Sequence, residues 1–177
     1  NLNTLIEMNL VHIAGSYQSS GGRKANVFEC IPDARYAVGI DITRNHLSIV
    51  LINLNLDIIA QKRMRCPFED STIYYENMCN ELELLLDSHN LDRNKLLGVG
   101  ISLPVIVESD HKTIWYTAVI NISRNVYQHI KSRLQYPFLL FNDASSAGLA
   151  ESWKYRSSRT SAYISLSSSV GGALMNA

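Results

Sequence analysis

The sequence predicts a layered α/β domain in which helices cover the faces of a mixed β-sheet. Three apolar segments rich in β-branched residues follow one another at 36–41, 46–53 and 58–65, with short polar turns between them. This pattern is typical of successive antiparallel strands. Amphipathic segments then alternate with short apolar ones, which is typical of helices that connect buried parallel strands. The predicted order from Tyr36 onward is therefore βββαβαβαββ, in a three-layer architecture.

The first 30 residues predict a separate small unit. Apolar residues at helical spacing indicate the last turns of a helix over 1–9. Strand-like segments follow at 10–14 and 25–30, on either side of a Ser- and Gly-rich loop. Helix, strand, flexible loop and strand is the order of the back half of a winged helix, and the alternative is a frayed leader with a linker. The predicted domains are therefore 1–30 and 31–177.

The main domain begins after a Pro-containing junction and continues beyond the three strands with helices and strands in turn. Ser71 or Thr72 is expected to cap the first helix, because a hydroxyl there accepts a hydrogen bond from a free backbone N–H group. The expected later elements are a helix to Ser88, a buried strand at 96–102, its continuation at 105–108 into an exposed turn, a helix at 126–134, a strand at 138–141, a helix at 144–155 and a closing hairpin with 161–166 and Leu174.

Composition indicates a soluble globular protein. Hydrophobic residues make up 46% of the 177 residues and charged residues 18%, and the formal net charge is zero. No broad basic surface is expected, so any contact with nucleic acid must come from an N-terminal segment that is mostly absent. No apolar run approaches the ~18 residues of a membrane span, and no signal peptide is recognisable, so no membrane association is expected. The start at Asn1 and the end just after a glycine pair indicate a segment of a longer protein.

Cysteine usage indicates a reducing, cytoplasmic setting. Cys30, Cys66 and Cys79 are odd in number and lack CxxC spacing, so neither a disulfide framework nor a zinc site is expected. The five histidines are each alone in their elements, and none pairs with another at the spacing of helical metal ligands. We therefore expect no metal site in this chain.

Four motifs resemble the ROK family of bacterial repressors, uncharacterised reading frames and sugar kinases. They are ARYAVGIDIT, GVGISLPVIVE, FNDASSAGLAE and AYISLSSSVGGALM, in the family's order and at similar spacing. The resemblance implies an actin-like, ribonuclease H-like fold, of which 31–177 would be the N-terminal lobe. The second lobe, with the family's zinc-binding Cys/His segment, would lie beyond Ala177. The segment SSGGRKANVFECIPDARY also resembles the linker after the winged helix-turn-helix in the xylose and N-acetylglucosamine repressor branch, whereas the kinases start near Tyr36.

Asp143 is the first candidate for a ligand site. It follows Asn142 at the end of an apolar strand and opens a helix of small residues. As a helix cap it would stabilise the helix by ~1 kcal/mol, and as a base it would accept a proton from a sugar hydroxyl during phosphoryl transfer. The resemblance assigns Asp143 to the family's catalytic aspartate, which in a non-enzymatic member holds the sugar by hydrogen bonds, with Asn142 as neighbour or cap. It also assigns Asn121 to sugar contact, where the alternative is a turn or capping residue.

Two motifs that bind nucleotide phosphates in the kinases are altered here. The first runs Asp, any residue, Gly, Gly, Thr in the kinases and reads DITRN here, from Asp41 through Thr43. The second keeps only Gly171 and Gly172 after a run of serines at 167–169. Glycines let backbone N–H groups close around a phosphate, whereas side chains crowd that space. We therefore expect ATP binding to be weak or absent.

The whole pattern predicts the central part of a cytoplasmic, sugar-responsive transcriptional repressor. As the resemblance implies, a sugar or sugar-phosphate effector would bind between two lobes and contact Asp143 and Asn121. Closure of the lobes would reposition the DNA-binding heads of a homodimer on operator DNA. One alternative is an ATP-dependent, glucokinase-like sugar kinase with Asp143 as its base. A second alternative is a degenerate interaction module that binds neither ligand.

Overall fold

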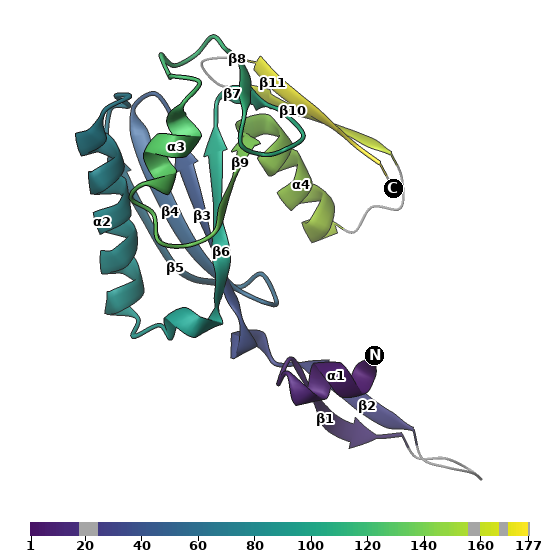
Figure 1. Cartoon of the computed structure of the whole chain (residues 1–177). Helices are drawn as coiled ribbons and strands as arrows, with labels where there is room; N and C mark the ends of the chain where they lie inside the picture. The colour runs from purple at the N-terminus through teal and green to yellow at the C-terminus, as the bar shows by residue number, and fades with distance from the viewer. Residues whose placement is uncertain (18–24, 156–159, 167–169, 177) are drawn as a thin grey trace.

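The computed structural model describes residues 1–17, 25–155, 160–166 and 170–176, and Figure 1 shows a small N-terminal unit extending from a larger domain. The unit contains α1 (Leu2–Glu7), β1 (Val11–Ser16) and β2 (Asn26–Cys30). The larger domain contains η1 (Pro32–Ala34), β3 (Tyr36–Ile42), β4 (His46–Asn53), β5 (Ile58–Arg65), α2 (Thr72–Ser88), η2 (Arg93–Lys95), β6 (Leu96–Leu103), β7 (Val105–Val107), β8 (Ile114–Thr117), α3 (Val126–Lys131), β9 (Phe138–Asn142), α4 (Asp143–Tyr155), β10 (Ser161–Leu166) and β11 (Val170–Met175). No helix in these ranges is both long and apolar enough to cross a membrane.

Five strands form the central sheet, in the order β5-β4-β3-β6-β9. β3, β4 and β5 pair antiparallel, whereas β6 pairs parallel with β3 and with β9. The predicted run of antiparallel strands and the crossover to parallel strands are therefore both confirmed. Because β3, β6 and β9 run in the same direction, their carboxyl ends meet at one edge of the sheet (Figure 1).

Alternation along the strands gives the sheet one fully buried face. Ile40 and Ile42 of β3 are 1% and 0% exposed on this face. α2 and α3 cover it, and Tyr75 and Leu82 of α2 are both 0% exposed (Figure 1). α2, which the amphipathic pattern of the sequence predicted, therefore closes the hydrophobic core with its apolar side.

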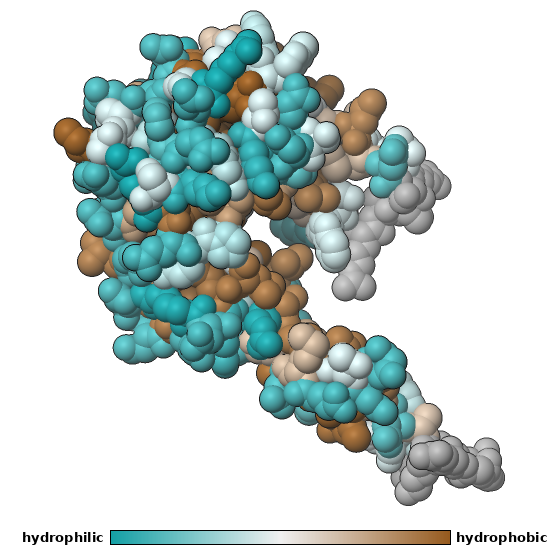
Figure 2. Space-filling model, in the orientation of Figure 1, coloured by the Kyte–Doolittle hydropathy of each residue, from teal (hydrophilic) through white to brown (hydrophobic). Residues whose placement is uncertain are grey.

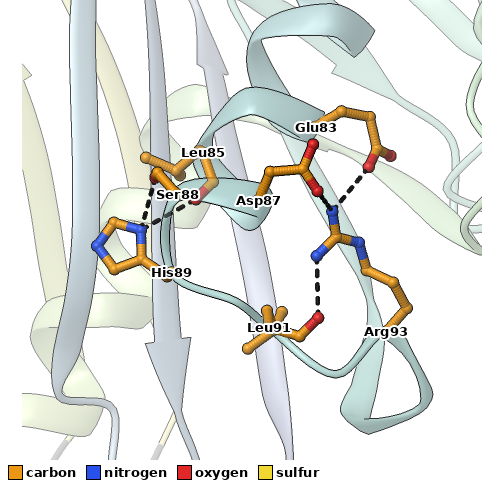
Figure 3. A network of polar contacts seen from close by, with 7 residues as sticks. All are labelled: Glu83, Leu85, Asp87, Ser88, His89, Leu91 and Arg93. Carbon is orange, nitrogen blue, oxygen red and sulfur yellow. Dashed lines mark hydrogen bonds and ion pairs between the residues drawn. The ribbon is translucent and has the colours of Figure 1, made fainter.

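Polar side chains fix both ends of α2. The Ser71 hydroxyl accepts a hydrogen bond from the backbone N–H three residues later at 3.3 Å, which confirms Ser71 as the N-cap. At the other end, Figure 3 shows Arg93 reaching back to the carboxylates of Glu83 and Asp87. Arg93 also donates to the Leu91 carbonyl at 3.0 Å. A single guanidinium therefore fixes the turn that leads into β6.

The second face of the sheet is covered only in part. α4 starts at the carboxyl end of β9 and packs against β6 and β9, and the β10–β11 hairpin packs on α4 (Figure 1). Gly148 of α4 permits this close packing, because a Cβ there would lie 2.9 Å from the side chain of Met175. Figure 2 shows hydrophobic residues exposed beside the hollow between the sheet and α4. The predicted three layers are present, with α2 and α3 on one side and α4 on the other.

Two elements differ from the prediction. α3 ends at Lys131 and not near 134, because the chain leaves the helix at Ser132. The chain after β7 also turns back as β8, which the sequence did not predict, and β7 and β8 pair as an antiparallel hairpin. β8 is only four residues long and has two adjacent exposed aromatics, so it lacks the alternation that signals a strand.

The N-terminal unit has the expected helix and two strands, and β1 and β2 pair antiparallel. The loop between them falls at 18–24, outside the described residues. The junction that follows is held against the larger domain, because the Pro32 carbonyl accepts from the Leu54 N–H at 3.0 Å and the Asp33 carbonyl from the Lys95 ammonium at 3.0 Å. The unit therefore joins β3 at the end opposite to Asp41. Its assignment to a winged helix stays a prediction.

We predict that Leu82→Ala lowers the free energy of unfolding by about 2–5 kcal/mol, because it leaves a cavity under a fully buried side chain. Leu84→Ala is the matched control on the same helix, since Leu84 is 58% exposed, and its effect should stay within about 0.5 kcal/mol. Urea denaturation measures both variants. Equal losses would contradict the orientation of α2.

Candidate functional site

A row of side chains crosses the second face of the sheet at one level. Asp41 of β3 pairs with Ser48 of β4 on one side and with Ser102 of β6 on the other. Ser48 pairs in turn with Arg63 of β5. Residues in register share a face, and this face is opposite to the buried neighbours of Asp41. The row lies at the carboxyl ends of the parallel strands, where open α/β sheets place ligand groups.

Asp41 is a carboxylate in a partly desolvated position. Burial raises the pKa of Asp41 above its ordinary value, while a hydrogen bond from the Ser102 hydroxyl opposes this rise. The nearby charge of Asp143 raises the pKa further, and the charge of Arg63 lowers it. Two carboxylates that are far apart in the sequence therefore interact at this end of the sheet.

Asn142 and Asp143 stand at the start of α4, where the sequence left open which of the two caps the helix. Asn142 is the cap of α4, because its Oδ1 accepts from the backbone N–H of Ser145 at 2.9 Å. Its Nδ2 donates to the Val105 carbonyl at 2.9 Å and to Oδ1 of Asp143 at 3.1 Å. Oδ1 of Asp143 also accepts a hydrogen bond from the backbone N–H of Ala144 at 2.8 Å. No hydrogen bond to Oδ2 of Asp143 occurs among the described residues.

A pocket of about 190 Å³ opens beside Asp143. Its lining comes from the start of α4, the β7–β8 hairpin, the segment after β8 and the β10–β11 hairpin, which gather at one end of the domain in Figure 1. Of the predicted site residues, the pocket brings together Asn142, Asp143 and Gly171. Sequence reasoning missed a mostly apolar part of the lining, which includes Val105, Ile106, Tyr116, Val119 and Val170.

The segment that carries Asn121 is anchored at both ends. The Arg44 guanidinium donates to the Val119 carbonyl at 2.7 Å, and the Ser123 N–H donates to Oδ2 of Asp70 at 2.6 Å. The isoleucines on either side of Asn121 are each 7% exposed. Asn121 itself is therefore presented at the surface, but it does not line the pocket.

The predicted nucleotide-site residues have structural roles. The Thr43 hydroxyl accepts from the His46 N–H at 3.0 Å and donates to the His46 carbonyl at 3.2 Å, which closes the turn between β3 and β4. A Cβ at Gly171 would lie 2.8 Å from the Cβ of Ala144, and a Cβ at Gly172 would lie 3.2 Å from a carbonyl of β10. Both glycines therefore serve close packing. The serines at 167–169 lie outside the described residues.

The resemblance places the family's zinc-binding Cys/His segment beyond Ala177, outside this chain. No group of three or more His, Cys, Asp or Glu side chains in the described part of the chain is arranged to hold a metal ion.

Comparisons with known proteins give the family of this chain and match its fold. The sequence model of the ROK family matches residues 37–177. The xylose repressor of Bacillus spizizenii is 23% identical over 99% of this chain and 46% of its own length. A solved ROK family transcriptional regulator, a homolog of the Escherichia coli MLC protein, has a TM-score of 0.76 at 19% identity, over 99% of this chain and 45% of its own.

A ROK family glucokinase from Streptomyces griseus, in complex with glucose and AMPPNP, has a TM-score of 0.65 at 17% identity. It covers 80% of this chain, and the match spans 44% of the glucokinase. The chain thus spans less than half the length of these relatives. The shared architecture confirms the predicted actin-like fold.

We predict that Asp41→Asn raises the free energy of unfolding at neutral pH. The pKa of Asp41 is raised in the folded state, so its ionisation opposes folding. This cost is absent at pH values below the ordinary pKa of 3.8 and complete at pH values above the raised pKa of folded Asp41. The stability gained by the variant over wild type should therefore grow as the pH rises between these two pKa values. Urea denaturation across this pH window measures it. A variant less stable than wild type at neutral pH would show that the hydrogen bond from Ser102 and the charge of Arg63 outweigh the burial of Asp41.

Gly171→Ala should lower the free energy of unfolding by about 1–3 kcal/mol, because the new Cβ forces the β10–β11 hairpin away from α4. Gly15→Ala is the control, since nothing lies within 4 Å of the Cβ position in β1. Thermal or urea unfolding compares the two. If Gly171→Ala were as stable as wild type, the glycine would be free for a role other than packing.

Proposed function

The chain belongs to the ROK family, and we propose that it is the effector-binding part of a cytoplasmic transcriptional regulator that responds to a monosaccharide or sugar phosphate. The family includes both regulators and sugar kinases among the relatives of this chain. The choice between them is carried by the N-terminal unit and supported by the chemistry of the pocket.

The N-terminal unit is the observation that carries the proposal. The xylose repressor and the solved regulator each cover 99% of this chain, whereas the glucokinase covers 80%. The family domain itself begins at Ala37, immediately after the first residue of β3. α1, β1 and β2 are therefore what this chain shares with these two regulators beyond that domain, whereas the N-acetylglucosamine repressor of Escherichia coli covers 83% of the chain. In the proposal they are the end of a winged helix that contacts operator DNA, and two operator half-sites call for a homodimer.

The pocket supports a small polyhydroxylated ligand. Oδ2 of Asp143 has no hydrogen-bond partner among the described residues. Charge-assisted hydrogen bonds to carboxylates are stronger than neutral ones. The pocket of about 190 Å³ on this lobe has room for a ligand the size of a monosaccharide. Asn142 would orient Asp143, since it donates to the other oxygen of the same carboxylate. Such an effector shifts the regulator only through its different affinities for two states.

The kinase alternative uses the same carboxylate as a base toward a sugar hydroxyl. The turn between β3 and β4 argues against it. The Thr43 hydroxyl is hydrogen-bonded within that turn. Arg44 occupies a position where the kinases have a glycine, and its guanidinium donates a hydrogen bond to the Val119 carbonyl. Backbone N–H groups have little room to surround a phosphate there.

The first test is thermal unfolding of the protein that carries this chain, with xylose, glucose, N-acetylglucosamine and their phosphates, each with and without magnesium ATP. A ligand at about a hundred times its dissociation constant adds ~2.7 kcal/mol to stability, which raises the melting temperature measurably. We expect one sugar or sugar phosphate to raise it, with no further effect of ATP. A shift from ATP alone, or a sugar-induced shift that decays as sugar is consumed, would overturn the regulator in favour of the kinase.

We predict that Asp143→Asn abolishes the sugar-induced shift in melting temperature, because it removes the charged acceptor. Glu151→Gln is the matched control on the same helix, since Glu151 is exposed and lies outside this pocket. A kinase would instead lose turnover in Asp143→Asn. If Asp143→Asn left binding of the sugar unchanged, the pocket beside it would not be the effector site.

A further inference from the structure

We propose that Tyr116 and Ile106 form an apolar wall against which the flat C–H face of a pyranose ring packs, with Tyr116 determining specificity for ring-closed sugars. The proposal rests on the proposed sugar-binding function, and it assigns a role to two residues that sequence reasoning missed. Ile106 lies in the GVGISLPVIVE motif and Tyr116 outside the four motifs, and the resemblance assigned neither residue to sugar contact.

The hairpin pairing places the two side chains together. Ile106 of β7 and Tyr116 of β8 are direct partners in the antiparallel register, so their side chains lie side by side on one face of the hairpin. Both line the pocket, and they are 45% and 55% exposed. Val105 and Ile114 of the same two strands are 3% and 2% exposed. The hairpin is therefore anchored by buried side chains, while Ile106 and Tyr116 remain available to a ligand.

The lining of the pocket combines two kinds of chemistry. Asn142 and Asp143 contribute an amide and a carboxylate, whereas Ile106 and Tyr116 contribute an aliphatic and an aromatic surface. A pyranose has the same division, because its hydroxyl groups point outward along the ring edge and its axial C–H groups form an apolar face. Tyrosine suits such a ligand, since its ring is apolar and rigid and its hydroxyl is polar. A free phosphate would leave the apolar wall unused, since it has no apolar face.

The wall is held in place before any ligand binds. The Val105 carbonyl accepts from Nδ2 of Asn142 at 2.9 Å, so the hairpin is bonded to the residue that orients Asp143. At the tip of the hairpin, the His111 carbonyl accepts from the Leu140 N–H at 2.9 Å, which attaches the turn to β9.

The Asp110 carboxylate closes this turn by accepting from the N–H groups of Lys112 and Thr113, each at 2.9 Å. These bonds hold the pKa of Asp110 at about 2, so the turn stays closed at neutral pH. A wall that needs no ordering on binding gives more of its contact energy to affinity.

Exposure alone does not identify a residue that contacts the ligand, as Trp115 illustrates. Trp115 precedes Tyr116 on β8 and is 61% exposed, yet it does not line the pocket. If exposed aromatics on β8 served only to contact another protein, Trp115 and Tyr116 would be equally suited to that role. Trp115 therefore serves as a matched control for Tyr116.

The test is isothermal titration of the protein that carries this chain with whichever of xylose, glucose and N-acetylglucosamine gives the largest thermal shift. Tyr116→Ala should weaken binding by about tenfold, the order expected for loss of one aromatic contact. Tyr116→Phe should stay within about threefold of wild type because it keeps the ring, and Trp115→Ala should match wild type. The corresponding open-chain polyol has no ring face, so the preference for sugar over polyol should shrink in Tyr116→Ala.

The proposed apolar wall would be overturned by unchanged sugar affinity in Tyr116→Ala, or by an equal loss of sugar affinity in Trp115→Ala. A change in oligomeric state with intact affinity would also overturn it and assign Tyr116 to a protein interface. Asp143→Asn separates this failure from failure of the proposed function. If Asp143→Asn abolishes binding and Tyr116→Ala does not, only the wall fails. If no sugar binds the wild type, or Asp143→Asn is indifferent, the proposed function fails and the wall fails with it.

Discussion

Parallel pairing of β3 with β6, and of β6 with β9, is the constraint on which the rest of this structure depends. It brings the ends of three strands to one edge and sets Asp41, Ser102 and the Asn142–Asp143 pair at neighbouring positions, although they span a hundred residues of sequence. The pairing is held by burial of the opposite face under α2 and α3. A slip by one residue would turn that apolar face outward, so the core fixes the register and the register fixes the site.

The site is built from groups that also hold the fold together. Asn142 caps α4 with one end of its amide and binds both the β7 backbone and Asp143 with the other. Gly171 borders the pocket and also permits the hairpin to approach α4. These structural roles hold whether or not the proposed ligand binds. A substitution that keeps the fold but alters ligand contact has to target Oδ2 of Asp143 or the apolar wall, since these groups carry little of the packing.

Local patterns predicted the strands of the main sheet, the Ser71 cap and the position of Asn142 and Asp143 at a strand end, because each depends on neighbours in sequence. The rest of the site depends on contacts that local patterns do not encode. Arg44 is hydrogen-bonded to Val119, 75 residues later in the sequence, and Asp70 to Ser123, 53 residues later. β8 was missed because adjacent aromatics hide its alternation, and Tyr116 was missed with it. Asn121 was expected in the site from resemblance, yet its segment turns it to the surface beside the pocket.

The position of β3 limits how a ligand could act on the N-terminal unit. β3 runs from the junction after η1 to Asp41, and a strand of its seven residues spans roughly 23 Å at about 3.3 Å per residue. It is hydrogen-bonded on both sides, to β4 and β6, and Lys95 and Leu54 bind the junction at its start. A strand fixed along its whole length cannot slide or bend without breaking both ladders. Binding at the Asp143 pocket would therefore reach the N-terminal unit by rotation of the whole domain as a rigid body, and not by a signal passed along β3.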